Sequence, residues 1–168
     1  MRYIGRRLLE TIGLNPERLR LEYIAASEGN RYAEVMNDFS SKVRELGPVG
    51  HGEGIDETVL RRRLEVVYNL VPYIKLVERE RLRMPIQSVE AYHAFFTGDE
   101  FDKIFKELIS DKIEKGQILS ILREKPCSSK EVSEVLGVTP GAASNQLKRS
   151  AREGFVKFDV SRMRYCAA

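Results

Sequence analysis

Residues 128–159 read SSKEVSEVLGVTPGAASNQLKRSAREGFVKFD, and this stretch decides the fold of the C-terminal third of the chain. Either of the two opening serines can cap a short helix over 130–136, and Gly137 ends it, because glycine readily adopts the left-handed conformation that closes helices. Thr139 then provides a cap hydroxyl, and Pro140 occupies the first position of the next helix, where its missing N–H is not needed. The stretch predicts two helices joined by a tight turn.

The elements on either side complete a larger unit. An apolar helix over 113–122 precedes the pair, and the second helix of the pair runs to about Glu153 and ends at Gly154. Two short strands follow, over 155–159 and 163–166, with a turn between them. Two helices joined by a tight turn and followed by a hairpin form the arrangement that lays its second helix in the major groove of DNA. We therefore predict a winged helix-turn-helix.

Residues 110–168 resemble the winged-helix regulators of bacteria and archaea. On the third helix of this unit four polar side chains share one face by their spacing of three and four, and three more basic residues lie on the wing. Six basic residues against two acidic ones follow Pro140, an excess suited to phosphates. The candidate DNA-binding residues are Asn145, Lys148, Arg149, Arg152, Lys157, Arg162 and Arg164. A protein-docking role stays open, because winged helices also bind proteins and Ser150 stands where the family pattern has a leucine.

The first part of the chain predicts a helix, a strand and a helix. A helix ends at Gly13, a strand is expected over Leu19–Ala26, and an apolar stripe at helical spacing then runs to Gly47. Within this region a single strand leaves its backbone groups without ladder partners, so we expect a second chain to pair with it. The strand face assigned to that pairing consists of Leu19, Leu21, Tyr23 and Ala25.

Residues 13–48, GLNPERLRLEYIAASEGNRYAEVMNDFSSKVRELGP, are similar to the C-terminal part of the delta (iron-sulfur) subunit of methyl-viologen-reducing hydrogenase. The matching elements include Pro16-Glu17-Arg18 and the closing Leu46-Gly47-Pro48. The resemblance implies a place beside hydrogenase and heterodisulfide reductase, where the family subunit carries electrons on a [2Fe-2S] cluster. The cluster cysteines of that family lie upstream of the matching region, so no cluster residue is carried over to this chain.

The composition limits the chemistry of the chain. It has two cysteines, Cys127 and Cys166, which lie far apart in the sequence without a paired spacing such as C-x-x-C, and two histidines, His51 and His93. We therefore expect neither a tetrahedral zinc site nor a four-thiolate cluster within this chain. We expect no cofactor, metal ligand or catalytic residue in this chain, with [2Fe-2S] assigned to a partner subunit. No apolar run of membrane length and no signal peptide is evident, so we expect a cytoplasmic protein that does not contact a membrane.

The fold class expected is mainly α with small β (α+β), with a partial α-β-α segment, central helices and a C-terminal winged helix-turn-helix. Glycine-rich residues 49–56 form the expected linker between residues 1–48, the hydrogenase-like fragment, and residues 57–109, a helical connector. The winged unit follows over 110–168.

Two functional hypotheses follow. The first is a non-catalytic accessory subunit of a hydrogenase or heterodisulfide-reductase-type complex, in which the winged helix docks or regulates. The alternative is a DNA-binding winged-helix transcriptional regulator. The first expects an iron-sulfur or reductase subunit, or a homodimer, as partner, and the second expects double-stranded DNA. A stand-alone enzyme is not expected, although the chain can be a component of an oxidoreductase complex.

Overall fold

The computed structural model describes residues 2–83 and 88–168, and it divides the chain into two compact units, residues 1–61 and 62–168. The described part is mostly helical, with one two-stranded antiparallel sheet near the C-terminus. The expected mainly α class with small β is therefore confirmed. Within these residues no helix is long and apolar enough to span a bilayer.

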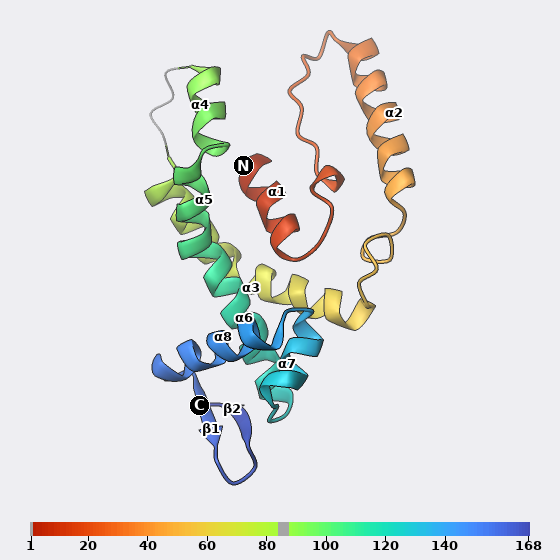
Figure 1. Ribbon diagram of the computed structural model, residues 1–168. Coiled ribbons are helices and arrows are strands. Elements are labelled where there is room, and N and C mark those ends of the chain that lie inside the picture. The colour runs from red at the N-terminus through yellow and green to blue at the C-terminus, as the bar shows by residue number, and fades with distance from the viewer. Residues whose placement is uncertain (1, 84–87) are drawn as a thin grey trace. The chain divides into compact units, whose positions relative to one another are not determined.

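The first unit contains helix α1 (Arg2–Thr11), a 3-10 turn η1 (Pro16–Arg18) and helix α2 (Gly29–Leu46) (Figure 1). Helix α1 ends before Gly13, whose φ of 85° lies in the left-handed region that glycine tolerates. Asn15 caps η1 by accepting a hydrogen bond from the backbone N–H of Glu17, at 2.9 Å. These local signals bring the chain back along α1 before it leaves for α2.

The predicted strand Leu19–Ala26 is wrong for the single chain: no strand is assigned to these residues. Leu19 itself has extended backbone angles, φ −117° and ψ 119°, so the conformation suits a strand at that residue. A strand also needs a neighbour to accept and donate its ladder hydrogen bonds, and the described part of the chain offers none there. The expected α-β-α segment is therefore a helix, a 3-10 turn, an irregular segment and a helix.

The sequence predicts Ser27 as the N-cap of helix α2, and the helix begins one residue later than that prediction. The N-cap residue is Glu28 rather than Ser27, and the Glu28 carboxylate accepts the backbone N–H of Ala25 at 2.8 Å instead of capping the helix. The apolar stripe that predicted α2 is present, but none of its residues is buried. Tyr32 and Met36 are exposed. The first unit thus has a helix whose apolar face is only partly covered.

The second unit begins inside helix α3 (Glu57–Arg81), a single helix that continues through Pro72. Because proline disrupts a helix, the sequence predicts a kink or a restart at Pro72, and the helix does not restart there. Proline removes one hydrogen bond of the ladder, and that loss is tolerable here because both Pro72 and Tyr68, one turn earlier, are exposed to water. From its place before this helix, the sequence predicts Asp56 as the N-cap, and the prediction is confirmed: the Asp56 carboxylate accepts the backbone N–H groups of Thr58 and Val59.

A longer helical run leads into the C-terminal part. Helix α4 (Val89–Phe96) is followed by α5 (Asp99–Phe105), a π-helical turn η2 (Lys106–Ser110) and α6 (Asp111–Glu124). Aromatic rings pack along this path, with 4.9 Å between the centroids of Phe96 and Phe101 and 5.7 Å between those of Phe101 and Phe105.

The winged helix-turn-helix forms as predicted, from α6, α7 (Ser129–Leu136), α8 (Pro140–Arg152), β1 (Val156–Asp159) and β2 (Arg164–Ala167) (Figure 1). Ser128 caps α7 in a capping box with Glu131, Gly137 ends α7 at a φ of 70°, and Thr139 caps α8. A buried cluster joins these elements; its members are Ile118, Ile121, Leu122, Cys127, Val132, Ala143, Leu147 and Val156. Strand β1 pairs with β2, and Cys127 adds a single bridge to Tyr165.

Candidate functional site

Helix α8 presents the polar face that its spacing predicts. Ala143, Leu147 and Ser150 are buried, whereas Asn145, Lys148, Arg149 and Arg152 are exposed. Gly141 and Ala142, exposed near the start of the helix after Pro140, are small, so its N-terminal half can approach another backbone closely. Because the start of this helix is the part that contacts base edges in a helix-turn-helix, Asn145 is well placed to reach a base.

Arg149 is not free on this face. Its guanidinium lies 2.8 Å from the Asp111 carboxylate of α6 and 3.5 Å from the Glu153 carboxylate. The hydrogen bond from Arg149 to Asp111, and to a lesser extent the negative charge of Glu153, raises the pKa of Arg149 above its ordinary value. Lys115 of α6 also pairs with Glu153 and lies 4.9 Å above the Phe155 ring. Sequence spacing could not reveal the Asp111 contact, because the two residues belong to different helices.

The wing residues also differ in what they contact. Arg162 lies at the hairpin turn, where its Nε is 3.8 Å from Asp159, and the Asp159 carboxylate accepts the backbone N–H groups of Ser161 and Arg162. Arg164 instead pairs with Glu131 at 3.0 Å and donates to the Pro126 carbonyl at 2.8 Å. Arg164 therefore ties the wing to the start of α7 and contributes less to an open basic surface.

Three of the six basic candidates have no ion-pair partner among residues 2–83 and 88–168. They are Lys148 and Arg152 on α8 and Lys157 on β1, and all three are exposed. Two large apolar side chains, Val160 and Met163, are exposed beside Arg162 at the tip of the wing. The surface can thus offer three unpaired cations to phosphates, with an amide at the start of the helix and apolar groups at the wing tip.

The first unit is held by an ion pair that sequence analysis did not identify. Arg18 of η1 makes two contacts with the Glu53 carboxylate, at 2.6 and 3.1 Å, and both side chains are nearly buried. Arg18 also donates to the carbonyls of Leu46 and Gly47 at the end of α2. Hydrogen bonds from Arg18, and from the backbone N–H groups of Asn15 and Gly50, lower the pKa of Glu53 to about 2.

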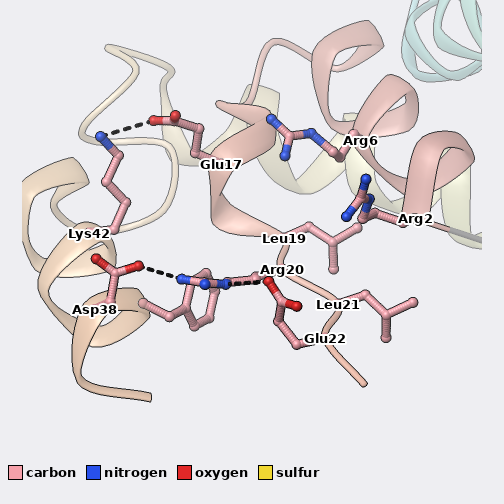
Figure 2. Close-up of a pocket in the computed structure, with 10 residues that line it drawn as sticks. Arg2, Arg6, Glu17, Leu19, Arg20, Leu21, Glu22, Asp38 and Lys42 are labelled. Carbon is pink, nitrogen blue, oxygen red and sulfur yellow. Dashed lines mark hydrogen bonds and ion pairs between the residues drawn. The ribbon is translucent and has the colours of Figure 1, made fainter. Parts of the chain in front are cut away.

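A pocket of about 400 Å³ opens in this unit between α1, residues 17–22 and α2 (Figure 2). Gly5 lets α1 pack closely against Leu19, because a Cβ atom at position 5 would lie 2.5 Å from the Leu19 side chain. Figure 2 shows Arg2 and Arg6 reaching from α1 toward the pocket. The pocket-lining residues are Arg2, Arg6, Glu17, Leu19, Arg20, Leu21, Glu22, Asp38, Phe39 and Lys42.

Of the four residues assigned to strand pairing, Leu19 and Leu21 line this pocket, and Tyr23 is 85% exposed beyond it. Ala25 is also exposed, but its N–H is held by Glu28. The structure therefore brings half of the predicted pairing face to one pocket. Sequence analysis missed the two α1 arginines, for which the only signal was their spacing of four residues.

The cysteines of the chain are too few for a [2Fe-2S] cluster held by four thiolates. A four-thiolate cluster needs four cysteines, and the sequence has two. Cys127 is buried, and this burial raises the pKa of its thiol, which disfavours the thiolate. Among the described residues no group of three or more histidine, cysteine, aspartate or glutamate side chains could hold a metal ion.

Comparison with known proteins identifies two segments. Residues 3–47 match the family described as methyl-viologen-reducing hydrogenase, delta subunit, and residues 115–157 match the family described as bacterial regulatory protein, arsR family. The chain is 52% identical over 42 residues to an iron-sulfur subunit of the F420-non-reducing hydrogenase of Archaeoglobus profundus, which is 25% of this chain and 31% of that protein. No solved structure matches significantly.

A second kind of relative contains a similar segment. The chain is 40% identical over 47 residues to one subunit of the ferredoxin/F420H2-dependent CoB-CoM heterodisulfide reductase of Methanosarcina acetivorans, which is 28% of this chain and 6% of that protein. The vhc iron-sulfur subunit of the F420-non-reducing hydrogenase of Methanococcus voltae is 39% identical over 41 residues, 24% of this chain and 28% of that protein. The chain thus spans less than a third of each of these curated relatives.

Proposed function

We propose that this chain is a non-catalytic accessory subunit of a hydrogenase or heterodisulfide-reductase-type electron-transfer assembly. In this proposal residues 1–61 dock on an iron-sulfur or reductase subunit, which holds the [2Fe-2S] cluster, and the winged helix docks or regulates. The observation that carries the proposal is the segment similar to the hydrogenase iron-sulfur subunits, because the same short segment occurs in two kinds of redox subunit.

The geometry of the first unit supports docking. Helix α2 belongs to the matched segment, yet its apolar stripe is not buried, and Tyr32 and Met36 are 57% and 44% exposed. A partly covered apolar stripe on a well-formed helix is typical of a surface that another protein covers. The buried pair of Arg18 and Glu53 fixes the end of α2, so this surface is presented by a defined structure.

The test is purification of the affinity-tagged chain from the cells that produce it, with iron, acid-labile sulfide and visible absorption measured on what co-purifies. We expect an iron-sulfur polypeptide in a fixed ratio to the tagged chain. Changing Tyr32 and Met36 to aspartate should release it, whereas Val160→Asp on the wing should not. A tagged chain that purifies without iron and sulfide under all growth conditions would contradict the proposal.

A second candidate function is DNA binding by the winged helix, favoured by the exposed face of α8. Lys148, Arg152 and Lys157 give three unpaired cations, so the logarithm of the affinity should fall with the logarithm of salt with a slope of about −3 for each winged helix bound. Duplexes from the region upstream of the gene, titrated at several salt concentrations, provide the measurement. Binding that is unchanged when all three become glutamine would exclude this face as the DNA contact.

A further inference from the structure

Most charges around the pocket of the first unit neutralise one another. Arg20 pairs with Asp38 and with Glu22, the latter at 3.2 Å, and Lys42 pairs with Glu17 at 3.1 Å (Figure 2). The pocket therefore contains three carboxylates, each of which already contacts a lysine or an arginine. The two guanidinium groups of α1 are the cations of the pocket that have no carboxylate partner among the described residues.

Arg2 and Arg6 lie one helical turn apart and have no carboxylate partner among residues 2–83 and 88–168. The Arg2 guanidinium lies 5.1 Å from the centre of the neighbouring Tyr3 ring and donates to its hydroxyl at 3.3 Å. Positions four apart on a helix project in nearly the same direction, and both side chains reach the pocket in Figure 2. Two adjacent guanidiniums offer a carboxylate several N–H donors at once.

The backbone beside these arginines is also unsatisfied. The N–H of Leu19 donates to the Pro16 carbonyl and that of Ala25 to Glu28, but within the described residues no hydrogen bond involves the backbone N–H and C=O groups of residues 20–24. Leu21 and Tyr23 in this segment are exposed. A run of free backbone groups with exposed apolar side chains is what an added strand pairs with.

We infer that residues 20–24 and the Arg2–Arg6 pair bind an acidic, extended segment of a partner protein. The backbone of the segment pairs with residues 20–24, and one of its carboxylates sits between the two guanidiniums. Its apolar side chains contact Leu19, Leu21 and Phe39, which line the pocket. This inference rests on the proposed docking function and gives the chemistry of the partner.

The other residues of the pocket favour such a peptide over a polyanion. Four cationic and three carboxylate side chains line the pocket, an excess of one positive charge, which suits a single carboxylate at Arg2 and Arg6 better than a ligand carrying several phosphates. A second copy of this chain is also a poor occupant. Antiparallel self-pairing centred on Glu22 would set two glutamates opposite one another, and like charges in that position destabilise a strand pair.

The experiment is selection of a display library of random twelve-residue peptides on the immobilised full chain. We expect enrichment of largely apolar sequences that carry an aspartate or glutamate at one fixed position. Synthetic copies of the selected peptides should bind in fluorescence anisotropy more weakly at high salt, and Arg6→Gln should weaken binding roughly tenfold. Arg44→Gln, an exposed arginine of α2 outside the pocket, is the matched control and should leave affinity unchanged.

Hydrogen exchange of the peptide complex separates this site from other surfaces. Amides of residues 20–24 should become protected on binding, and circular dichroism should show that Arg6→Gln leaves the fold intact. Selected peptides without acidic residues, no enrichment at all, or protection only elsewhere would overturn the inference. Self-association of the full chain that protects residues 20–24 would also overturn it and indicate a homodimer. If peptides fail while an iron-sulfur polypeptide still co-purifies, the docking function stands and uses another surface.

Discussion

Arg18 joins three parts of the first unit through one side chain. It pairs with Glu53, it satisfies carbonyls at the end of α2, and it belongs to η1. Only glycine fits at position 52 beside Arg18, because a Cβ atom there would lie 1.9 Å from the Leu46 carbonyl oxygen. Helix ends leave carbonyls without intrahelical partners, and a buried guanidinium that also holds a carboxylate is an effective way to satisfy them.

This arrangement predicts acid sensitivity in the first unit. The pKa of Glu53 falls from 4.5 to about 2 on folding, so its carboxylate stabilises the unit above pH 4.5 and that stabilisation is lost as the pH falls toward 2. Its full contribution at pH 7 is at most about 3 kcal/mol. Glu53→Gln should therefore lower the free energy of unfolding at neutral pH, and the difference from the unsubstituted chain should shrink below pH 4.5.

Hydrogen exchange of residues 1–61 in urea, measured from pH 7 to pH 3, would follow this difference. Glu57→Gln is the control, because that carboxylate contacts Arg61 at 3.3 Å while both side chains remain largely exposed. Exposed pairs contribute little to stability. A Glu53→Gln protein that matches the control at every pH would show that the pair with Arg18 does not stabilise the unit.

At the scale of single elements, helix α7 depends on its cap. The Ser128 hydroxyl accepts the Glu131 N–H at 3.2 Å, and the Glu131 carboxylate accepts the Ser128 N–H at 2.7 Å. Ser128→Ala should lower the free energy of unfolding of the winged helix by about 0.5–2 kcal/mol. Ser129→Ala, one residue inside the helix, should change it by much less. Urea titration of both variants by circular dichroism distinguishes the two serines, and equal effects would contradict the capping role.

Helix α8 should bind DNA more tightly when the carboxylate of Asp111, on the neighbouring helix α6, is removed. Asp111 of α6 holds the exposed guanidinium of Arg149, so a phosphate must compete with that carboxylate. Exposed pairs are weak, and Asp111→Asn should therefore tighten duplex binding by roughly three- to tenfold at low salt and steepen the salt slope by about one. Glu107→Gln, which removes an exposed carboxylate with no ion-pair partner among the described residues, is the control for net charge. Equal gains in both variants would show that Arg149 does not reach the DNA.

Local signals explain which elements could be predicted. The caps at Ser128 and Thr139, the left-handed Gly137 and the buried Leu147 act within one or two turns of helix, and each follows from residue type and spacing. The strand expected at Leu19 is wrong because a strand depends on a partner that the sequence of that segment does not contain. The contacts Arg18–Glu53 and Arg149–Asp111 join distant residues, so no spacing rule predicts them.

At the scale of the whole molecule, the chain joins two segments whose relatives have different functions. One segment is similar to a piece of a hydrogenase iron-sulfur subunit and of a heterodisulfide reductase subunit, and the other to bacterial regulatory proteins of the arsR family. The boundary between the two compact units falls between residues 61 and 62 of the sequence, inside α3. Because each match lies within a single unit, we expect the two proposed activities, docking and DNA binding, to be separable by mutation.

The second unit should fold without the first. Its core cluster, from Ile118 to Val156, lies wholly within residues 62–168, so a fragment of those residues keeps every member of that cluster. The fragment also keeps the α3 contacts that a winged helix starting at residue 110 would lose: Arg62 pairs with Glu124 at 2.9 Å, and Arg63 donates to the Leu136 carbonyl at 3.1 Å. Val66 packs closely on Gly116, where a Cβ atom would lie 2.6 Å from Val66 Cγ1.

We therefore expect fragment 62–168 to unfold in one cooperative transition and to be more stable than fragment 110–168 by more than about 2 kcal/mol, the effect of burying one or two large apolar side chains. The shorter fragment loses Phe101 and Phe105, which are buried in the chain. Urea titration followed by circular dichroism measures both fragments. Equal stabilities would mean that α3 and α5 add nothing to the winged helix, and a longer fragment without a cooperative transition would mean that the second unit depends on residues 1–61.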